Sequence, residues 1–181
     1  MSRVARKPIE VPEGVTLSVE GQKVEVSNGK LTLNHVVHDD VVINQGESGV
    51  HFSPSESAVN WALAGTSRAL VANMVAGLHK AYEIELETVG VGYRVKQEGQ
   101  KLVFTLGYSH PVEFLLPDHV EASVDKQVHL VIKSPIKALL GQTAANIIKL
   151  RKPDSYKGKG VQLKRGIKRL VKLKLKEVKK K

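Results

Sequence analysis

The residues best suited to binding chemistry lie near position 155, where the chain reads Pro153-Asp154-Ser155-Tyr156-Lys157-Gly158-Lys159-Gly160-Val161. Lysine ammonium groups neutralise negative charge, and the glycines allow the backbone to approach a charged surface closely. The tyrosine ring can stack on a base or a ribose. These residue types predict polyanion binding. A solvated, flexible basic loop is the alternative interpretation of the same pattern.

No group of residues in the sequence predicts catalysis. Gly90-Val91-Gly92 lacks the third glycine of a dinucleotide loop, and Lys157-Gly158-Lys159-Gly160 lacks the Ser/Thr and the spacing of a Walker loop. His35 and His38 imply no third metal ligand. Ser109-His110 are strand neighbours whose side chains point to opposite faces. We therefore expect no enzymatic activity, no cofactor, no bound metal and no small-molecule substrate.

Positive charge is gathered at one end of the chain. The 181 residues carry a net charge of +10, and residues 149–181 hold 15 Lys/Arg against two acidic residues, which leaves −3 on residues 1–148. A near-neutral body with a basic end indicates one face turned to an anionic partner, either a nucleic acid or an anionic membrane.

Composition narrows the class of protein further. A hydrophobic content of 41% indicates a folded core, and the absence of cysteine excludes disulfides and thiolate metal sites. No apolar run approaches the roughly 18 residues that a membrane span needs. We therefore expect a cytoplasmic protein that crosses no membrane.

Alternating apolar and polar residues predict an antiparallel sheet with one buried face in the first third of the chain. The expected strands are residues 15–19, 24–26, 31–33, 41–43 and 50–52. Asn28-Gly29, between two of these runs, is a strong hairpin signal.

A long helix is expected after these strands. Ser53-Pro54-Ser55-Glu56 matches a capping box with proline at the first helical position. The lone Trp61 is expected to anchor the core or a domain contact. The apolar face of this helix is predicted to comprise Val59, Leu63, Leu70, Met74 and Leu78.

The second half repeats the order of strands and then a helix. The expected strands are residues 84–89, 93–96, 102–106, 112–115, 120–124 and 128–132. Ser134-Pro135 opens the second helix, and Pro153 stops it. Its predicted apolar face comprises Ile136, Leu140, Ala144 and Ile147.

Glutamates at positions 83, 85 and 87 alternate along the first of these strands. We interpret them as the marks of a solvent-facing edge strand, where charge discourages pairing with other chains.

The halves are similar enough to predict a duplicated α+β unit, although two β-rich halves can also match by coincidence. Leu63-Ala64-Gly65-Thr66 is echoed by Leu139-Leu140-Gly141-Gln142, and the shared glycine suggests that each helix packs closely on its sheet. We expect two tandem similar domains, each a small antiparallel sheet packed against one helix. The predicted segments are residues 1–80 with a basic arm at 1–8, residues 81–152, and a basic C-terminal segment at residues 153–181.

Four motifs, in order along the chain, resemble one protein family. They are Met1-Ser2-Arg3-Val4-Ala5-Arg6-Lys7-Pro8, Val89-Gly90-Val91-Gly92-Tyr93-Arg94, Leu106-Gly107-Tyr108-Ser109-His110-Pro111-Val112 and the stretch at residues 153–161. Together they resemble the bacterial form of the sixth ribosomal protein of the large subunit, over roughly residues 1–161. Gln162-Leu163-Lys164-Arg165 departs from that family, whose bacterial members usually continue with Arg-Tyr and an acidic residue.

This resemblance implies a structural constituent of the large ribosomal subunit with two similar domains. It implies binding to 23S rRNA near the stalk base and the sarcin-ricin loop, beside neighbouring ribosomal proteins and the docking region of elongation factors. The first domain, with a net charge of −1 over residues 1–80, should face solvent or neighbouring proteins more than RNA. The residues expected to bind RNA are Arg3, Arg6, Lys7, Arg94, Tyr108, His110, Lys152, Tyr156, Lys157, Gly158, Lys159, Gly160, Lys164 and Arg165.

The alternative function is a nonspecific nucleic-acid or anionic-membrane binder that acts through the polybasic tail alone. The conformation of residues 162–181 stays open, because their apolar residues fit either a strand or a basic amphipathic helix.

Overall fold

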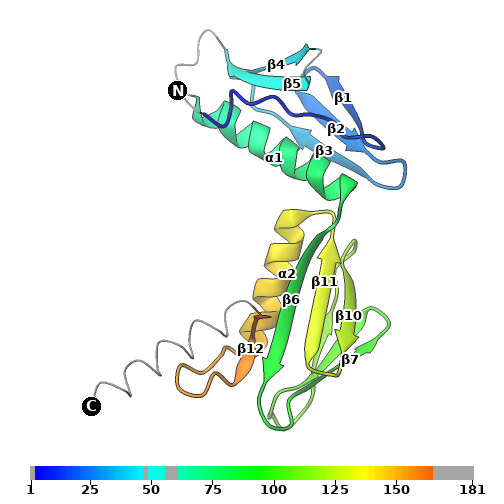
Figure 1. Cartoon of the computed structure of the whole chain (residues 1–181), viewed down its shortest axis with the longest axis vertical. Helices are drawn as coiled ribbons and strands as arrows, with labels where there is room; N and C mark the ends of the chain where they lie inside the picture. Colours follow the sequence, from blue (N-terminus) through cyan, green and yellow to red (C-terminus); the bar gives the residue numbers. More distant parts are fainter. Residues whose placement is uncertain (1–2, 47–48, 56–60, 165–181) are drawn as a thin grey trace, which may run out of the picture. The chain divides into compact units, whose positions relative to one another are not determined.

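A computed structural model describes residues 3–46, 49–55 and 61–164. The chain divides into two compact units, Met1–Ala81 and Tyr82–Lys181. Each unit combines antiparallel sheets with one helix (Figure 1). The predicted α+β architecture of two tandem sheet-and-helix domains is confirmed, with the strands of each unit divided between two sheets.

The first unit contains a three-stranded sheet and a separate hairpin. The sheet comprises β1 (Thr16–Glu20), β2 (Lys23–Ser27) and β3 (Thr32–Val36), and the hairpin comprises β4 (Val41–Gly46) and β5 (Gly49–Pro54). The turn between β2 and β3 forms at the predicted Asn-Gly. There the Asn28 side-chain oxygen accepts hydrogen bonds from the N–H groups of Lys30 and Leu31, at 3.1 and 3.0 Å.

Helix α1 (Ala62–His79) begins later than the capping pattern predicts. Strand β5 extends to Pro54, which lies opposite Val41 of β4. Pairing between the strands therefore prevails over the local capping signal, and Glu56 of that pattern lies outside the described residues. Trp61 immediately precedes the helix and packs against the core of this unit, which agrees with its expected role as a core anchor.

The buried face of α1 is lined by smaller side chains than predicted. Leu63 and Leu70 are 39% and 43% exposed, so assigning them to the core was wrong. The buried side chains of the helix that face the core are Ala64, Ser67, Val71, Val75 and Leu78. Leu78 is buried as predicted, Met74 packs partly buried against the core, and Val59 lies outside the described residues. Ala64, Val71 and Val75 each lie one position after a predicted residue, so the helical period alone does not identify the face.

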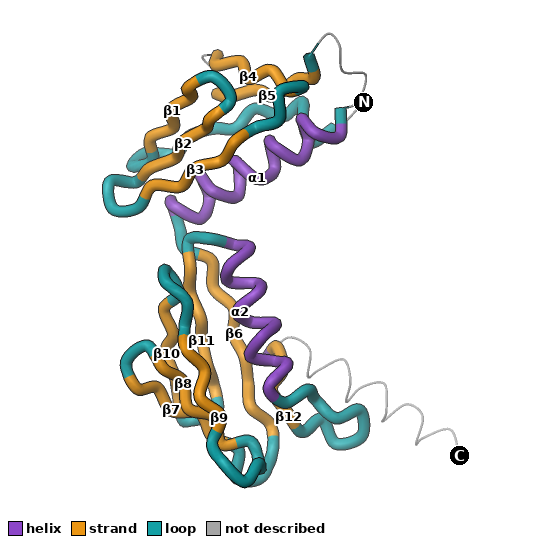
Figure 2. Tube along the Cα trace, turned by 180° about the vertical axis from the view of Figure 1, so that it is seen from behind, coloured by secondary structure: helices purple, strands orange, loops and turns teal. Residues whose placement is uncertain are grey.

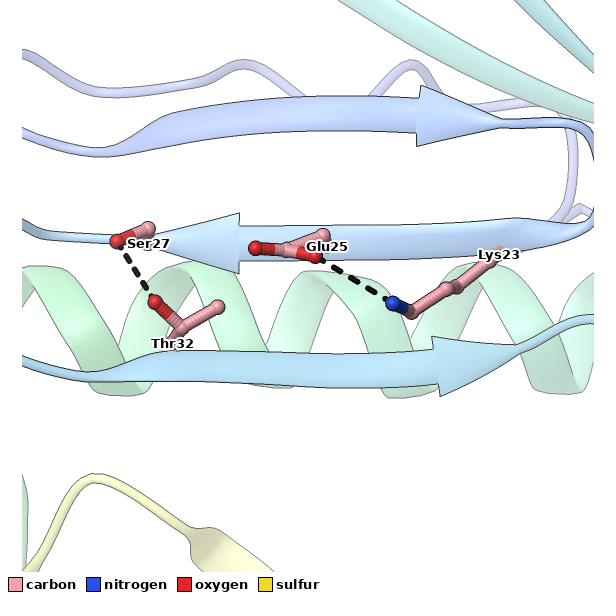
Figure 3. A network of polar contacts seen from close by, with 4 residues as sticks. All are labelled: Lys23, Glu25, Ser27 and Thr32. Atoms are coloured by element: carbon pink, nitrogen blue, oxygen red, sulfur yellow. Dashed lines mark hydrogen bonds and ion pairs between the residues drawn. The ribbon is translucent and has the colours of Figure 1, made fainter.

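The outer face of the three-stranded sheet is polar. Figure 3 shows Lys23, Glu25, Ser27 and Thr32 on the strands, with α1 behind them. Lys23 pairs with Glu25 at 3.6 Å, and the Thr32 hydroxyl donates to Ser27 at 3.1 Å. Val24, between Lys23 and Glu25, is fully buried. The two-residue period of β2 thus separates the solvent face from the core.

The N-terminal basic segment packs on the first unit. Ile9 is buried and exchanges two backbone hydrogen bonds with Val50, at 3.0 and 3.2 Å. Arg68 of α1 donates from Nε to the Lys7 carbonyl at 3.1 Å and from Nη2 to the Pro8 carbonyl at 3.0 Å. Residues 7–9 are therefore fixed to both β5 and α1.

The second unit contains a four-stranded and a three-stranded sheet. The four-stranded sheet has the order β10 (Glu121–Asp125), β11 (His129–Ser134), β6 (Tyr82–Val89) and β12 (Gly160–Leu163). The other sheet comprises β7 (Arg94–Glu98), β8 (Lys101–Thr105) and β9 (Val112–Leu115). Figure 1 shows the β10-β11-β6 face, and Figure 2 shows α2 and the second sheet on the opposite side.

Helix α2 (Lys137–Leu150) forms where the sequence predicts it, except that Ile136 of the predicted face is the extended residue that precedes the helix. Leu140, Ala144 and Ile147 are buried on one face, as expected. They join a core that also includes Leu86, Leu102, Phe104, Leu130, Ile132 and Val161. Gly141 is exposed, and no atom outside its own turns of the helix lies within 4 Å of where its Cβ would be, so the expectation of close packing there was wrong.

Strand β12 is the main departure from the sequence prediction. It pairs antiparallel with β6, with Val161 opposite Thr88, so β6 lies inside the sheet between β11 and β12. The interpretation of the glutamates on β6 as marks of an edge strand was therefore wrong. Instead, Glu83 pairs with Lys133 at 3.2 Å, and Glu85 pairs with Lys164 at 2.6 Å.

Candidate nucleic-acid interface

The loop between α2 and β12 is organised by Asp154. The backbone N–H groups of Tyr156 and Lys157 both donate to its carboxylate, at 3.2 Å each. Its own N–H donates to the Lys159 carbonyl at 2.8 Å, and its carbonyl accepts the N–H of Gly158 at 2.9 Å. This carboxylate and backbone network gives the basic loop a defined shape, which a flexible basic loop would lack.

The two glycines of this loop have different roles. Gly160 is buried with φ at +142°, and a Cβ there would lie 2.7 Å from the Pro153 Cα and 2.8 Å from the carbonyl oxygens of Arg151 and Lys152. Gly158 has φ at +68° and open space around it. Close packing within the protein therefore accounts for the glycine at 160, and the expected close approach of these glycines to a partner stays a prediction.

The cationic side chains of the loop point into solvent. Lys152, Lys157 and Lys159 are exposed, and none of the three forms an ion pair with another described residue. Tyr156 is 85% exposed. Asp154 is occupied with backbone N–H groups, so the loop presents its positive charges outward.

The turn after β6 is built around the Tyr93 ring. A Cβ on Gly90 would lie 2.8 Å from the Tyr93 Cδ2 atom, and a Cβ on Gly107 would lie 3.2 Å from Cε1. The ring is therefore packed against the backbone of two separate turns. The same turn leaves Val91 95% exposed and Arg94 exposed.

Tyr108 connects the turn after β8 to the end of α2. Its hydroxyl donates to the Leu150 carbonyl at 3.0 Å, and the Arg151 guanidinium carbon lies 4.8 Å from its ring centroid. The hydrogen bond with Tyr108 is the main reason why the pKa of Arg151 is raised, and interaction with Tyr93 adds to it. Tyr108 is 46% exposed, so these contacts use only part of its surface.

These contacts bring together residues 90–94, 107–110 and 151–159, which we call the three-segment surface. Tyr93 joins the first segment to the second, and Arg151 and Tyr108 join the second to the third. Pairing of Gly160 with Val89 places the third segment beside the start of the first. Three loops that are distant in sequence thus form one end of the second unit.

Most of the predicted RNA-binding residues lie in these three segments. They are Arg94, Tyr108, His110, Lys152, Tyr156, Lys157, Gly158 and Lys159, with Gly160 at the start of β12. Lys164, the residue after β12, instead pairs with Glu85 of β6, and the hydrogen bond to that carboxylate raises the pKa of Lys164. Arg3, Arg6 and Lys7 are exposed residues of the first unit, and Arg165 lies outside the described residues.

Three residues important to this surface were missing from the predicted set. Tyr93, Arg151 and Asp154 join or shape the segments. Tyr93 and Asp154 stand inside motifs that the sequence analysis identified, but their roles depend on contacts with residues elsewhere. The sequence around Arg151 carries no signal beyond its charge.

The described residues show no sign of two other kinds of site. Within residues 3–46, 49–55 and 61–164, no three His, Cys, Asp or Glu side chains are grouped in a way that could hold a metal ion. In the same part of the chain, no helix has the length and apolarity to span a membrane.

Comparisons with known proteins identify the family. The family model described as Ribosomal protein L6 matches residues 89–164, which include the three-segment surface. The large ribosomal subunit protein uL6 of Chromohalobacter salexigens is 48% identical over 162 residues, covering 90% of this chain and 92% of the relative. The uL6 proteins of Cellvibrio japonicus and Alcanivorax borkumensis are 48% and 45% identical, over the same shares of both chains. The chain therefore belongs to the uL6 family of large-subunit ribosomal proteins, which are structural and non-enzymatic.

Proposed function

We propose that the protein is a scaffold of the large ribosomal subunit that binds 23S rRNA through the three-segment surface. The convergence of three loops with outward-facing cations carries this proposal. Arg94, Lys152, Lys157 and Lys159 supply positive charge that phosphates can neutralise. Tyr156, with its largely exposed ring, supplies a stacking surface for a base or ribose.

Family membership supports the rest of the proposal. The relatives are named as large ribosomal subunit proteins, and the motifs of this chain resemble those of a family that lies near the stalk base. In the cytoplasmic ribosome, the protein then supports the region around the sarcin-ricin loop where elongation factors dock. Its first unit faces solvent or neighbouring proteins, because residues 1–80 carry a net charge of only −1.

Charge removal on the third segment tests the phosphate contacts. The double variant Lys157→Gln/Lys159→Gln should weaken binding to a 23S rRNA fragment. The slope of log K against log salt concentration should become shallower by about 1.4 to 1.8, because each lost phosphate contact contributes about 0.7 to 0.9. Filter binding between 50 and 200 mM salt measures this slope; over that range the loss of two contacts should reduce the salt-dependent fall in affinity by about one decade.

A control variant with the same loss of charge distinguishes binding through the three-segment surface from an effect of net charge alone. Lys30→Gln/Lys80→Gln removes two exposed cations from the first unit. It should leave the salt slope and the affinity nearly unchanged. Equal effects of the two double variants would show that rRNA responds only to overall charge, and the proposal would fail.

Deletion of residues 165–181 tests the tail-only alternative and leaves β12 intact. The proposal expects weaker but still specific binding to the rRNA fragment. Complete loss of that binding would instead favour a binder that acts through its tail. Equal affinity of the full chain for phosphatidylserine vesicles and for the rRNA fragment would favour the membrane form of that alternative.

A further inference from the structure

The Tyr93 ring has an unusual position for a tyrosine in a surface turn. Both turns that it contacts have glycine at the contact point, with φ at +153° for Gly90 and +74° for Gly107. Any side chain at Gly90 would overlap the ring. The ring thus fills the space that the two glycines leave, and it is half-buried there.

Contacts continue from this ring to the basic loop. The ring contacts Gly107, whose neighbour Tyr108 carries the Arg151 guanidinium over its own ring at 4.8 Å, and the Tyr108 hydroxyl donates to the last carbonyl of α2. The Arg151 carbonyl accepts the N–H of Val161 at 2.9 Å, which closes the base of the loop that carries Lys157 and Lys159. Tyr93, Tyr108 and Arg151 form a connected group, which we call the brace.

We propose that Tyr93 is a positioning residue for rRNA binding, which holds the three segments in their binding arrangement through the brace. This inference rests on the proposed function, because it concerns the same surface. Ordering three separate loops at the moment of binding costs conformational entropy. A surface already held together by packing avoids that cost, so its cations meet the RNA in a fixed arrangement.

Replacement of the ring tests this role. Tyr93→Leu should raise the Kd for the 23S rRNA fragment about tenfold, because the loops must then be ordered on binding. The salt slope should stay unchanged, because no phosphate-binding cation is removed. Tyr93→Phe keeps the ring between the two glycines and should restore most of the affinity.

A second variant disturbs the ring without removing it. Gly107→Ala places a methyl group 3.2 Å from Tyr93 Cε1, at a backbone φ of +74° that disfavours alanine. It should reproduce the weaker binding and the unchanged slope of Tyr93→Leu. This agreement would assign the effect to the position of the ring.

The control for general destabilisation is Phe114→Leu. Phe114 is a partly buried aromatic residue of the same unit, and its partner Leu102 lies at the other end of β8 from Gly107. This variant should lower the melting temperature and leave the rRNA affinity unchanged. If it weakens binding as much as Tyr93→Leu does, the effect comes from lost stability, and the positioning role is refuted.

The outcomes also separate this inference from the proposed function. Unchanged affinity of Tyr93→Leu, together with a shallower salt slope in Lys157→Gln/Lys159→Gln, would refute the brace and keep the proposed function. A shallower slope in Tyr93→Leu would make the residue part of a phosphate contact and would also refute positioning. An unchanged slope in the lysine double variant would refute the proposed function itself.

Discussion

At the scale of single residues, the two glycines of the basic loop carry different constraints. Position 158 favours glycine only because its backbone is left-handed. Position 160 requires glycine both for its backbone conformation and because a Cβ there would have no room. The space at Gly160 is bounded by backbone atoms of residues 151–153, which cannot move aside as a flexible side chain can.

Gly160→Ala should therefore lower the free energy of unfolding by about 2 kcal/mol or more, through backbone strain and overpacking. Gly158→Ala is the matched control and should cost about 1 kcal/mol, from its left-handed conformation alone. Urea denaturation of both variants measures the difference. Equal losses would contradict the packing of Gly160 against residues 151–153.

The residue types of the candidate site were largely predictable, because the charge of lysine, the backbone freedom of glycine and the stacking surface of tyrosine follow from residue type alone. The exposed cations Lys157 and Lys159 were identified this way. The internal role of Gly160 was not, because it depends on the fold of residues 151–153. Tyr93 and Arg151 were missed for the same reason, since their contacts join segments that are far apart in the sequence.

At the scale of elements, one hairpin uses residues poorly suited to its turn. Lys126 and Gln127, between β10 and β11, have φ at +53° and +58°. Two consecutive left-handed residues are typical of a turn that prefers Asn-Gly. The Gln127 carbonyl accepts the N–H of Val95 at 2.8 Å, so the turn also anchors β7.

Lys126→Asn/Gln127→Gly should raise the free energy of unfolding by about 1 kcal/mol, because it relieves the left-handed strain and keeps the backbone bond to Val95. Chemical denaturation checks this. Gln100→Gly, at a turn residue without positive φ, is the control and should be destabilising. A similar gain from both changes would argue against strain as the cause.

Elements β1 to β11 and α2 were predictable because their apolar periods are local. The start of α1 was not, because pairing between β4 and β5 includes Pro54 of the capping pattern. Strand β12 has only four residues, and its partner lies more than 70 residues earlier in the chain. Its absence from the prediction led directly to the wrong interpretation of the glutamates on β6.

At the scale of the whole molecule, the described residues form two separate cores. One contains buried residues from Ala5 to Leu78, and the other from Leu86 to Val161. No residue belongs to both. Each unit therefore has the hydrophobic core that independent folding requires.

We expect a fragment of residues 82–181 to fold cooperatively alone and to bind the 23S rRNA fragment within a few-fold of the full chain, since it keeps the three-segment surface. Circular dichroism melting and filter binding test both points. The fragment of residues 1–81 is the control and should fold without binding. A fragment of residues 82–181 that stays unfolded would show that its core needs the first unit.

The pairing of β12 with β6 has a consequence for synthesis. Strand β6 opens the second unit, and the strand that completes its far side is translated only after α2. A nascent chain that stops before Gly160 lacks β12. The loop carrying Lys157 and Lys159 is then not closed by the pairing of β12 with β6. The second unit therefore acquires its complete proposed rRNA-binding surface only late in translation, after its other strands and α2 have been made.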